Sequence, residues 1–148
     1  MPKPKERMAG YIRESDPSLA DSNTIDSQAK AVFEYGQREG YRYDITQHEY
    51  KEAISAYMVP YMQRKRLLDM LAAAKRHEFN VLVVTEIRAL SHRQVEVFVI
   101  YEMLQKAGVR LETIHEKFED SAIGRYILAT RAMIAEVERE NTHMRTTR

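Results

Sequence analysis

The order of apolar and polar positions along the chain predicts strands that alternate with helices. Strand-like stretches, with alternating or continuous apolar residues, cover residues 7–14, 41–49, 79–87 and 109–115, and a loop is expected over residues 50–60. Apolar residues with helical spacing cover residues 25–39, 61–76 and 92–106. The Val-Leu-Val-Val run at 81–84 is typical of a central parallel strand covered on both faces. We therefore expect a layered α/β domain, with a mainly parallel sheet of about four strands and flanking helices.

The end of the chain has a different pattern, which predicts one long C-terminal helix from residue 121. Its apolar residues cover more than one helical face and are Ile123, Tyr126, Ile127, Leu128, Met133, Ile134 and Val137. A helix that is apolar on two sides needs two partners, which are either the domain alone or the domain and a second chain. After Glu136 the helix becomes strongly polar. The expected division is a core over residues 1–120 and, over residues 121–148, a helix that oligomerises and leads to a further region.

Composition narrows the class of protein. A chain of 148 residues with 44% hydrophobic and 30% charged residues is typical of one soluble globular domain. The net charge of +1 gives no overall electrostatic attraction to nucleic acid, and the absence of cysteine excludes disulfides and thiolate sites. The five histidines have no metal-ligand spacing. No apolar run approaches the roughly 20 residues that span a bilayer, and no signal sequence is recognisable, so a cytoplasmic protein is expected.

The first predicted strand ends in a group of residues that can carry chemistry. Tyr11, Arg13 and Ser15 alternate, so their side chains share one face of the strand. A hydroxyl at the C-terminal end of a strand, beside a fixed guanidinium, lies where open α/β sheets place their active sites. A serine in this position is more often a turn or capping residue, so the pattern has to be supported by the rest of the chain.

Several segments together resemble one family. Tyr11-x-Arg13-x-Ser15 followed by Gln28, Arg64 ahead of the second long helix, and Ser-Ala-Ile-Gly-Arg at 121–125 followed by residues 134–140 are similar to the catalytic domain of serine recombinases of the resolvase and invertase type. The number of residues between Ser15 and Gln28 is more similar to that in the large serine integrases and transposon recombinases than to that in the compact resolvases. The resemblance implies a resolvase-like fold and an enzyme of DNA recombination or integration on a mobile element.

The resemblance also implies a mechanism and roles for residues. Ser15 would attack a DNA phosphodiester and form a 5′-phosphoserine link, without metal or other cofactor, in dimers that pair into a tetramer through the C-terminal helix. The helix would then connect to a DNA-binding region. Arg13 and Arg64 would stabilise the phosphate, as planar guanidinium groups do. Gln28 would belong to the catalytic set and help to orient Ser15 or a phosphate. Residues with supporting roles would be Tyr11, either Glu49 or Glu52, and Arg139, which can instead form a salt bridge between helices.

One segment departs from the family. Where the family carries an Asp-Arg pair and a second arginine after the central strand, this chain has Arg88, Ala89 and His92, followed by Arg93. Three interpretations are open: Arg88 and Arg93 supply the two cations, His92 replaces one arginine and makes the site depend on pH, or cleavage has been lost. In an active enzyme we expect Arg88, which is nearest the strand end, to serve the site.

Two other classes of protein remain as alternatives. One is a recombinase-like module that binds DNA or assembles without cleaving it. The other is a flavodoxin-like signalling domain, because alternation of strands and helices alone fits that fold. Such a domain has clustered acidic residues at the end of its first strand, whereas this chain has Arg13 beside Ser15.

Overall fold

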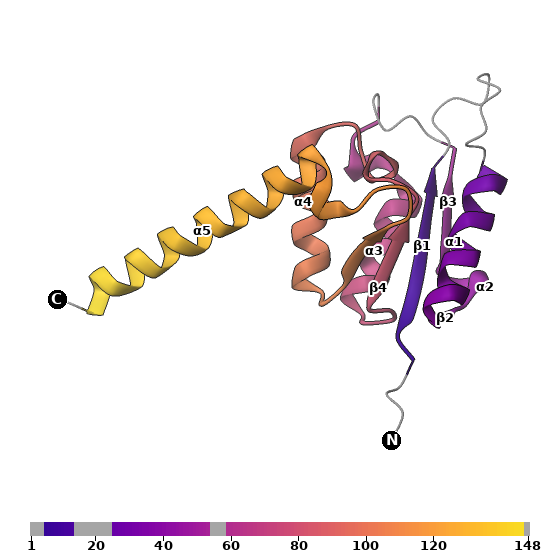
Figure 1. Cartoon of the computed structure of the whole chain (residues 1–148), viewed down its shortest axis with the longest axis horizontal. Helices are drawn as coiled ribbons and strands as arrows, with labels where there is room; N and C mark the ends of the chain where they lie inside the picture. The colour runs from indigo at the N-terminus through magenta and orange to yellow at the C-terminus, as the bar shows by residue number, and fades with distance from the viewer. Residues whose placement is uncertain (1–4, 14–24, 54–58, 147–148) are drawn as a thin grey trace. The chain divides into compact units, whose positions relative to one another are not determined.

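The computed structural model describes residues 5–13, 25–53 and 59–146, in which a parallel sheet forms the centre of the main unit (Figure 1). The five strands are β1 (Arg7–Arg13), β2 (Arg42–Tyr43), β3 (Glu49–Glu52), β4 (Val81–Val84) and β5 (Arg110–Thr113). β1 is central, since β2 and β3 pair with successive parts of one edge and β4 with the other, and β5 lies beyond β4. All pairs are parallel, so the strand ends that can carry a site lie on one edge of the sheet.

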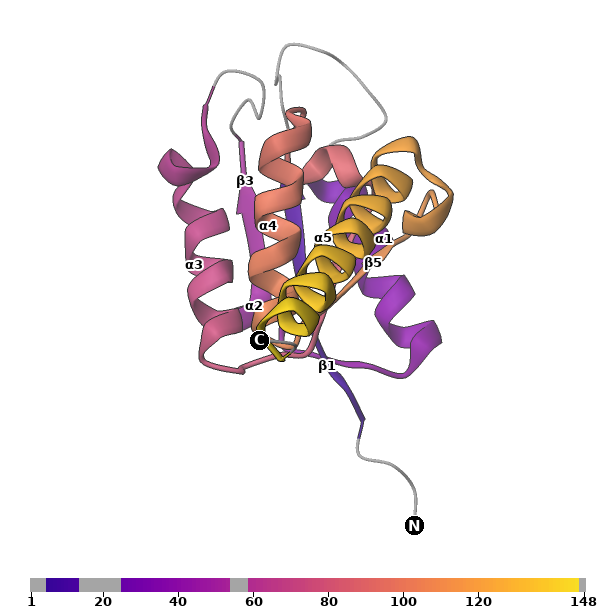
Figure 2. The ribbon, with the colours of Figure 1, turned by 90° about the vertical axis from the view of Figure 1, so that its left-hand side faces the viewer.

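Helices cover both faces of this sheet. They are α1 (Ile25–Glu39), α2 (Ile45–His48), α3 (Lys65–Lys75) and α4 (Gln94–Lys106), with short 3-10 turns η1 (Tyr61–Gln63) and η2 (Ile87–Ala89). Figures 1 and 2 show α1 on one face of the sheet and α3 and α4 on the other. The expected layered α/β fold with a mainly parallel sheet is confirmed.

Three expectations for residues 41–76 are wrong in part. The single strand over residues 41–49 is divided into β2 and β3 by α2, and β3 runs into the stretch expected to be loop. The division occurs because Asp44 accepts hydrogen bonds from the backbone N–H groups of Thr46 (3.0 Å) and Gln47 (3.3 Å) and so caps a single helical turn. The helix expected over 61–76 is likewise interrupted at Arg64, whose backbone is extended, with φ −95° and ψ 97°.

Glycine allows α1 to lie close to the central strand. A Cβ atom on Gly10 would come within 2.8 Å of Val32 Cγ1 and within 2.5 Å of the Tyr43 hydroxyl. Met8 and Ile12, on the same side of β1 as Gly10, form a core cluster with Val32. The alternate residues of β1, which include Tyr11 and Arg13, therefore face the layer of α3 and α4. This alternation determines which side chains meet at the C-terminal edge.

The chain divides into two compact units, residues 1–116 and 117–148, slightly before the boundary expected after residue 120. The second unit contains η3 (Phe118–Asp120) and the long helix α5 (Ala122–Thr146), which confirms the predicted C-terminal helix. Gly124 is required at its start, because a Cβ atom there would lie 1.7 Å from the Phe118 carbonyl oxygen. Several apolar side chains of α5 are exposed and are Tyr126, Leu128, Met133, Ile134, Val137 and Met144. No helix in the described part of the chain is long and apolar enough to cross a membrane.

Candidate active site

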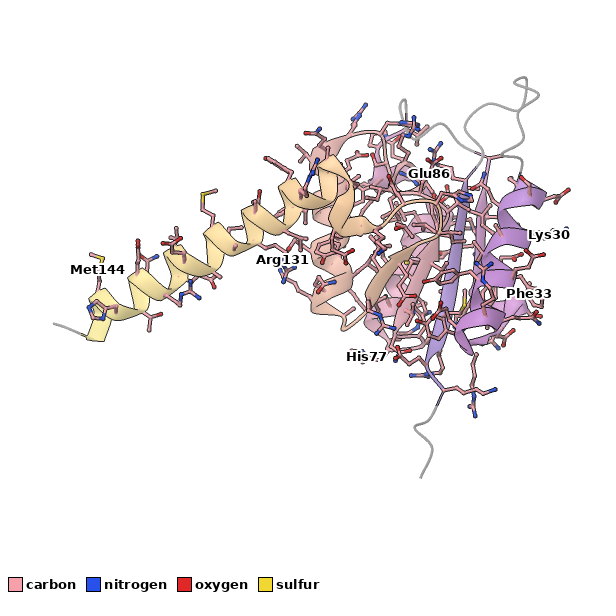
Figure 3. The ribbon with its side chains drawn as sticks, viewed as in Figure 1. Lys30, Phe33, His77, Glu86, Arg131 and Met144 are labelled. Carbon is pink, nitrogen blue, oxygen red and sulfur yellow. The ribbon has the colours of Figure 1, made fainter. Side chains whose placement is uncertain are left out.

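Arg13 lies at the C-terminal end of β1 and is held from both sides of the sheet. Its Nε donates to the Ala89 carbonyl oxygen (3.1 Å) and its Nη2 to that of Arg88 (2.7 Å). From the α1 side, Gln28 Nε2 donates to the Arg13 carbonyl oxygen (3.0 Å), and both side chains are buried. These contacts fix the guanidinium at the edge of the sheet where Figure 3 labels Glu86, whereas His77 lies at the opposite edge.

Arg64 is the second arginine at this edge, and its side chain is completely buried. It donates to the Leu90 carbonyl oxygen, to the Ala89 carbonyl oxygen (3.4 Å) and to the Tyr11 hydroxyl (2.5 Å). Its guanidinium carbon lies 5.5 Å from the centroid of the Tyr11 ring. Three consecutive carbonyl groups, at residues 88–90, thus hold Arg13 and Arg64 together.

The break in the helix at Arg64 makes this geometry available. Arg64 is the N-cap residue of α3, and its extended backbone lets the side chain enter the site ahead of the helix. Its N–H donates to the Tyr61 carbonyl oxygen (3.1 Å), and its carbonyl accepts the first hydrogen bond of α3, from the N–H of Leu68 (3.0 Å). The local sequence therefore orients Arg64 through the junction between η1 and α3.

A buried carboxylate completes the network around Arg64. The Tyr11 hydroxyl, which accepts from Arg64, donates to Glu52 Oε1 (3.1 Å), and the same oxygen accepts from the backbone N–H of Leu67 (2.5 Å). Glu52 therefore stabilises the N-terminal turn of α3, whose N–H groups lack helical partners. Burial raises the pKa of Tyr11 despite the opposing effect of Arg64, so its hydroxyl stays protonated and can donate.

The structure distinguishes the two carboxylates that the sequence left open. Glu52 is the one brought to Tyr11 and Arg64, because it ends β3 directly opposite Arg13 in the β1–β3 register. Glu49 lies at the other end of β3, where it accepts from the Tyr43 hydroxyl (3.4 Å) and pairs with Lys51 (3.0 Å).

The segment over residues 88–93 follows β4 and contacts Arg13 through backbone carbonyl groups and the His92 ring. Arg13 Nη2 lies 3.3 Å from Nε2 of His92, whose side chain is exposed. Arg88 contributes its carbonyl to Arg13, while its own side chain is 71% exposed and lies 3.7 Å from Glu86. Arg93 lies 4.0 Å from Glu96. The pKa of His92 is lowered mainly by burial and further by the positive charges of Arg13 and Arg88. The pKa of Arg13 is lowered mainly by burial and further by the charge of Arg64.

Sequence reasoning missed Glu96, a buried carboxylate in the first turn of α4. It accepts from the Ser91 hydroxyl (2.8 Å) and from the backbone N–H of Tyr61 (3.2 Å), so it connects η1 to the turn after η2. The helix expected from residue 92 begins at Gln94, and the Ser91 hydroxyl accepts from the N–H of Arg93 (3.0 Å). The available signal was an acidic residue in the first turn of a predicted helix.

Ser15 and Arg139 are the remaining residues that the sequence analysis expected at the site. Ser15 lies outside the described residues, two positions after Arg13 in the sequence. Arg139 is exposed on α5, in the second unit. Within the described ranges, no group of three histidine or acidic side chains is placed to hold a metal ion. The described site offers the guanidinium groups of Arg13 and Arg64. Such groups bind and stabilise phosphate oxygens.

Comparisons with known proteins identify a family and a fold. The profile described as "Resolvase, N terminal domain" matches residues 8–148, whereas no curated protein matches the chain. The N-terminal catalytic domain of TP901-1 integrase is similar in structure, with a TM-score of 0.70 and 19% identity over 93% of this chain and 99% of that chain.

Two further solved structures have the same fold. The C-terminal catalytic domain of ISC1926 TnpA, an IS607-like serine recombinase, has a TM-score of 0.63 and 19% identity over 87% of this chain and 80% of that chain. A resolvase family site-specific recombinase from Streptococcus pneumoniae has a TM-score of 0.66 and 17% identity over 97% of this chain and 94% of that chain.

Proposed function

Because this chain belongs to the family of the resolvase N-terminal domain and has the fold of serine recombinase catalytic domains, we propose that it cleaves and rejoins DNA through Ser15. The observation that carries the proposal is the position of Arg13. Its guanidinium is fixed at the C-terminal end of the central strand, two residues before the serine. The resemblance of Tyr11-x-Arg13-x-Ser15 to the family supports the same assignment.

The proposed reaction is a transfer of the phosphoryl group to the serine. The Ser15 hydroxyl gives up its proton, and its oxygen forms a bond to phosphorus. The bond from phosphorus to the 3′ oxygen breaks, and that oxygen takes up one proton and leaves as a 3′ hydroxyl, so no net proton is gained or lost. Attack by a 3′ hydroxyl on the 5′-phosphoserine reverses these changes and joins a new strand. Negative charge grows on the phosphate oxygens during both steps, and a preorganised guanidinium stabilises it.

The arginines divide this work. Arg13, which is held by two carbonyl groups and lies beside the exposed His92, is assigned to the phosphate. Arg64 is completely buried and bonded to Tyr11 and to carbonyl groups, so we assign it to positioning: it holds the 88–90 turn against which Arg13 lies. Glu52 and Gln28 fix the neighbouring backbone in the same way. Arg88, exposed at the same edge, remains the candidate for a further phosphate contact.

Assembly through α5 belongs to the same proposal. Met133, Val137 and Met144 are each at least 50% exposed and follow one another at intervals of four and seven residues, which places them along one side of the helix. An exposed apolar stripe of this kind suits a second copy of the chain. Dimers formed through this stripe would pair into the tetramer in which strands are exchanged. A cytoplasmic location is part of the proposal, as expected for an enzyme acting on cellular DNA.

The test is the covalent intermediate. The protein, incubated with DNA that contains its recombination site, should give an adduct that survives denaturation, and Ser15→Ala should give none while keeping the parent's circular dichroism spectrum. Arg13→Lys should bind the same DNA but form adduct on the order of 10²-fold more slowly, because a single ammonium replaces a bidentate donor. An adduct formed by the Ser15→Ala protein would refute the assignment of the nucleophile.

A second candidate function is a recombinase-like module that binds DNA without cleaving it. The observation that favours it is Ala89, which offers a carbonyl to Arg13 and Arg64 where the family resemblance implies an arginine side chain. This alternative predicts DNA binding without adduct by the parent protein, on every site at which a related active recombinase forms one.

A further inference from the structure

The contact between Arg13 and His92 fixes the protonation state of His92 in the free protein. A guanidinium has donors and no acceptor, so an Arg13 Nη2–H pointing at His92 Nε2, 3.3 Å away, requires that nitrogen to carry a lone pair. His92 is then neutral, with its proton on Nδ1. A protonated ring would offer only donors toward Arg13 and would add a positive charge beside it.

The charges around His92 favour this neutral form. Three arginines act on it: Arg13 from β1, Arg64 from the start of α3, and Arg88 from η2. Among the described residues, Glu86 acts in the opposite direction, and it lies 3.7 Å from Arg88. On the side of α4, Arg93 lies 4.0 Å from Glu96. Burial and the excess of positive charge lower the pKa of His92, although its side chain stays exposed at the sheet edge.

A phosphate at Arg13 would offset the positive charge around His92 and would offer acceptors to a protonated His92 ring. Its negative charge offsets one of the guanidinium charges, and its oxygens accept hydrogen bonds from Arg13 and from a protonated His92 at once. We propose that a DNA phosphate bound at Arg13 draws a proton from solvent onto His92, so that His92 becomes a second cation of the site only in the complex. This inference rests on the proposed function, which supplies the phosphate, and identifies the group that takes the place of a missing arginine.

The coupling has a defined sign. Because the complex binds more protons than the free protein between the pKa of free His92 and its higher value in the complex, DNA affinity falls as pH rises through that interval. Below the interval His92 is protonated in both states, and above it His92 is neutral in both, so affinity is constant there. A rise of one pKa unit on binding corresponds to tenfold weaker binding above the interval than below it.

The test uses the 148-residue protein with Ser15→Ala, which cannot react, and a short DNA duplex of random sequence at low salt, where phosphate contacts dominate binding. Carbon-13 labelled imidazole signals give the pKa of each histidine with and without duplex, and His92→Gln identifies the signal of His92. We expect duplex to raise the pKa of His92. The signal of His77, which lies at the opposite edge of the sheet (Figure 3), serves as the control.

Affinity measured by fluorescence anisotropy between about pH 5.5 and pH 8 gives an independent readout. The parent should bind more weakly as pH rises, His92→Gln should lose most of that dependence, and His92→Arg should bind tightly throughout because its charge is fixed. If duplex binds with equal affinity across this range and the pKa of His92 does not move, the proton coupling is wrong. That result leaves the recombinase assignment intact, because the latter depends on the covalent adduct and not on His92.

Discussion

Replacement of Arg64 is the clearest test of whether a buried arginine positions the site or contacts the phosphate directly. Its side chain is completely buried, and its donors satisfy the Leu90 carbonyl and the Tyr11 hydroxyl. Arg64→Met keeps much of the hydrophobic volume but removes these donors. The variant is therefore expected to lose stability first and activity as a consequence.

The magnitude follows from the groups left behind. Each buried acceptor that loses its donor costs about 1–3 kcal/mol, and the Glu52 carboxylate loses the cation that reaches it through Tyr11. Among the described residues, Oε2 of Glu52 has no hydrogen-bond partner that would compensate. We expect Arg64→Met to lower the free energy of unfolding by about 3–5 kcal/mol, a large part of the roughly 5–15 kcal/mol of a typical domain.

Urea denaturation, followed by circular dichroism, measures this loss. The matched control is Arg66→Met, because Arg66 is a near neighbour in sequence whose side chain is 41% exposed and pairs with Asp69 (2.9 Å). That exposed pair contributes about 1 kcal/mol at most. If Arg64→Met unfolds at the same urea concentration as Arg66→Met and yet forms no adduct, Arg64 contacts the phosphate and the positioning role is refuted.

A double-mutant cycle tests the connection through Tyr11. Glu52→Gln keeps an oxygen that can accept from Tyr11 and Leu67 but removes the buried negative charge. If the charge of Glu52 makes Arg64 necessary, Arg64→Met should cost about 1–3 kcal/mol less in the Glu52→Gln background. Equal costs in both backgrounds would show that the carbonyl groups of Ala89 and Leu90 account for the effect of Arg64.

Two further predictions concern α5 and the turn after β4. Met133→Glu should shift sedimentation toward monomer with the fold retained, because Met133 is 60% exposed. Ile127→Glu should instead unfold the protein, since Ile127 is buried. A parent chain that sediments as a monomer at high concentration would contradict assembly through α5. Arg88→Ala should slow adduct formation by on the order of 10²-fold if Arg88 contacts the phosphate. Arg93→Ala should slow it much less, since Arg93 lies near Glu96. Equal rates of adduct formation for the two variants would exclude Arg88 from that role.

The sequence predicted the fold well where local patterns agree with tertiary structure. The apolar run at 81–84 became the buried strand β4, and the alternation in residues 7–14 placed Tyr11 and Arg13 on one face. It failed over residues 41–52, where the alternation of Tyr41, Tyr43 and Ile45 suggested one strand. The Asp44 cap overrides that pattern, and a single helical turn then moves the pairing with β1 from Met8 to Gly10.

That local failure also explains why the sequence could not show which of two carboxylates contacts Tyr11. Glu49 and Glu52 are both on β3, and their distance from Arg13 depends on the register of β3 against β1. The register is set by the length of α2, which no hydrophobic pattern indicates. The burial of Arg64 could not be predicted from the sequence for a similar reason. It depends on carbonyl groups that lie 25 and 26 residues further along the chain.

The segment 88–92 contacts the two buried arginines mainly through its backbone. Its contacts to Arg13 and Arg64 run largely through the carbonyl groups of residues 88–90, which any residue type can provide, so Ala89 is compatible with the same backbone arrangement. What a side chain must supply is charge at the phosphate, and His92 already touches Arg13. Under the proposed coupling, a fixed cation at position 92 would repel Arg13 in the free protein, whereas His92 would stay neutral until a phosphate binds. A histidine at this position would then lessen repulsion before binding and make the full charge of the site depend on DNA.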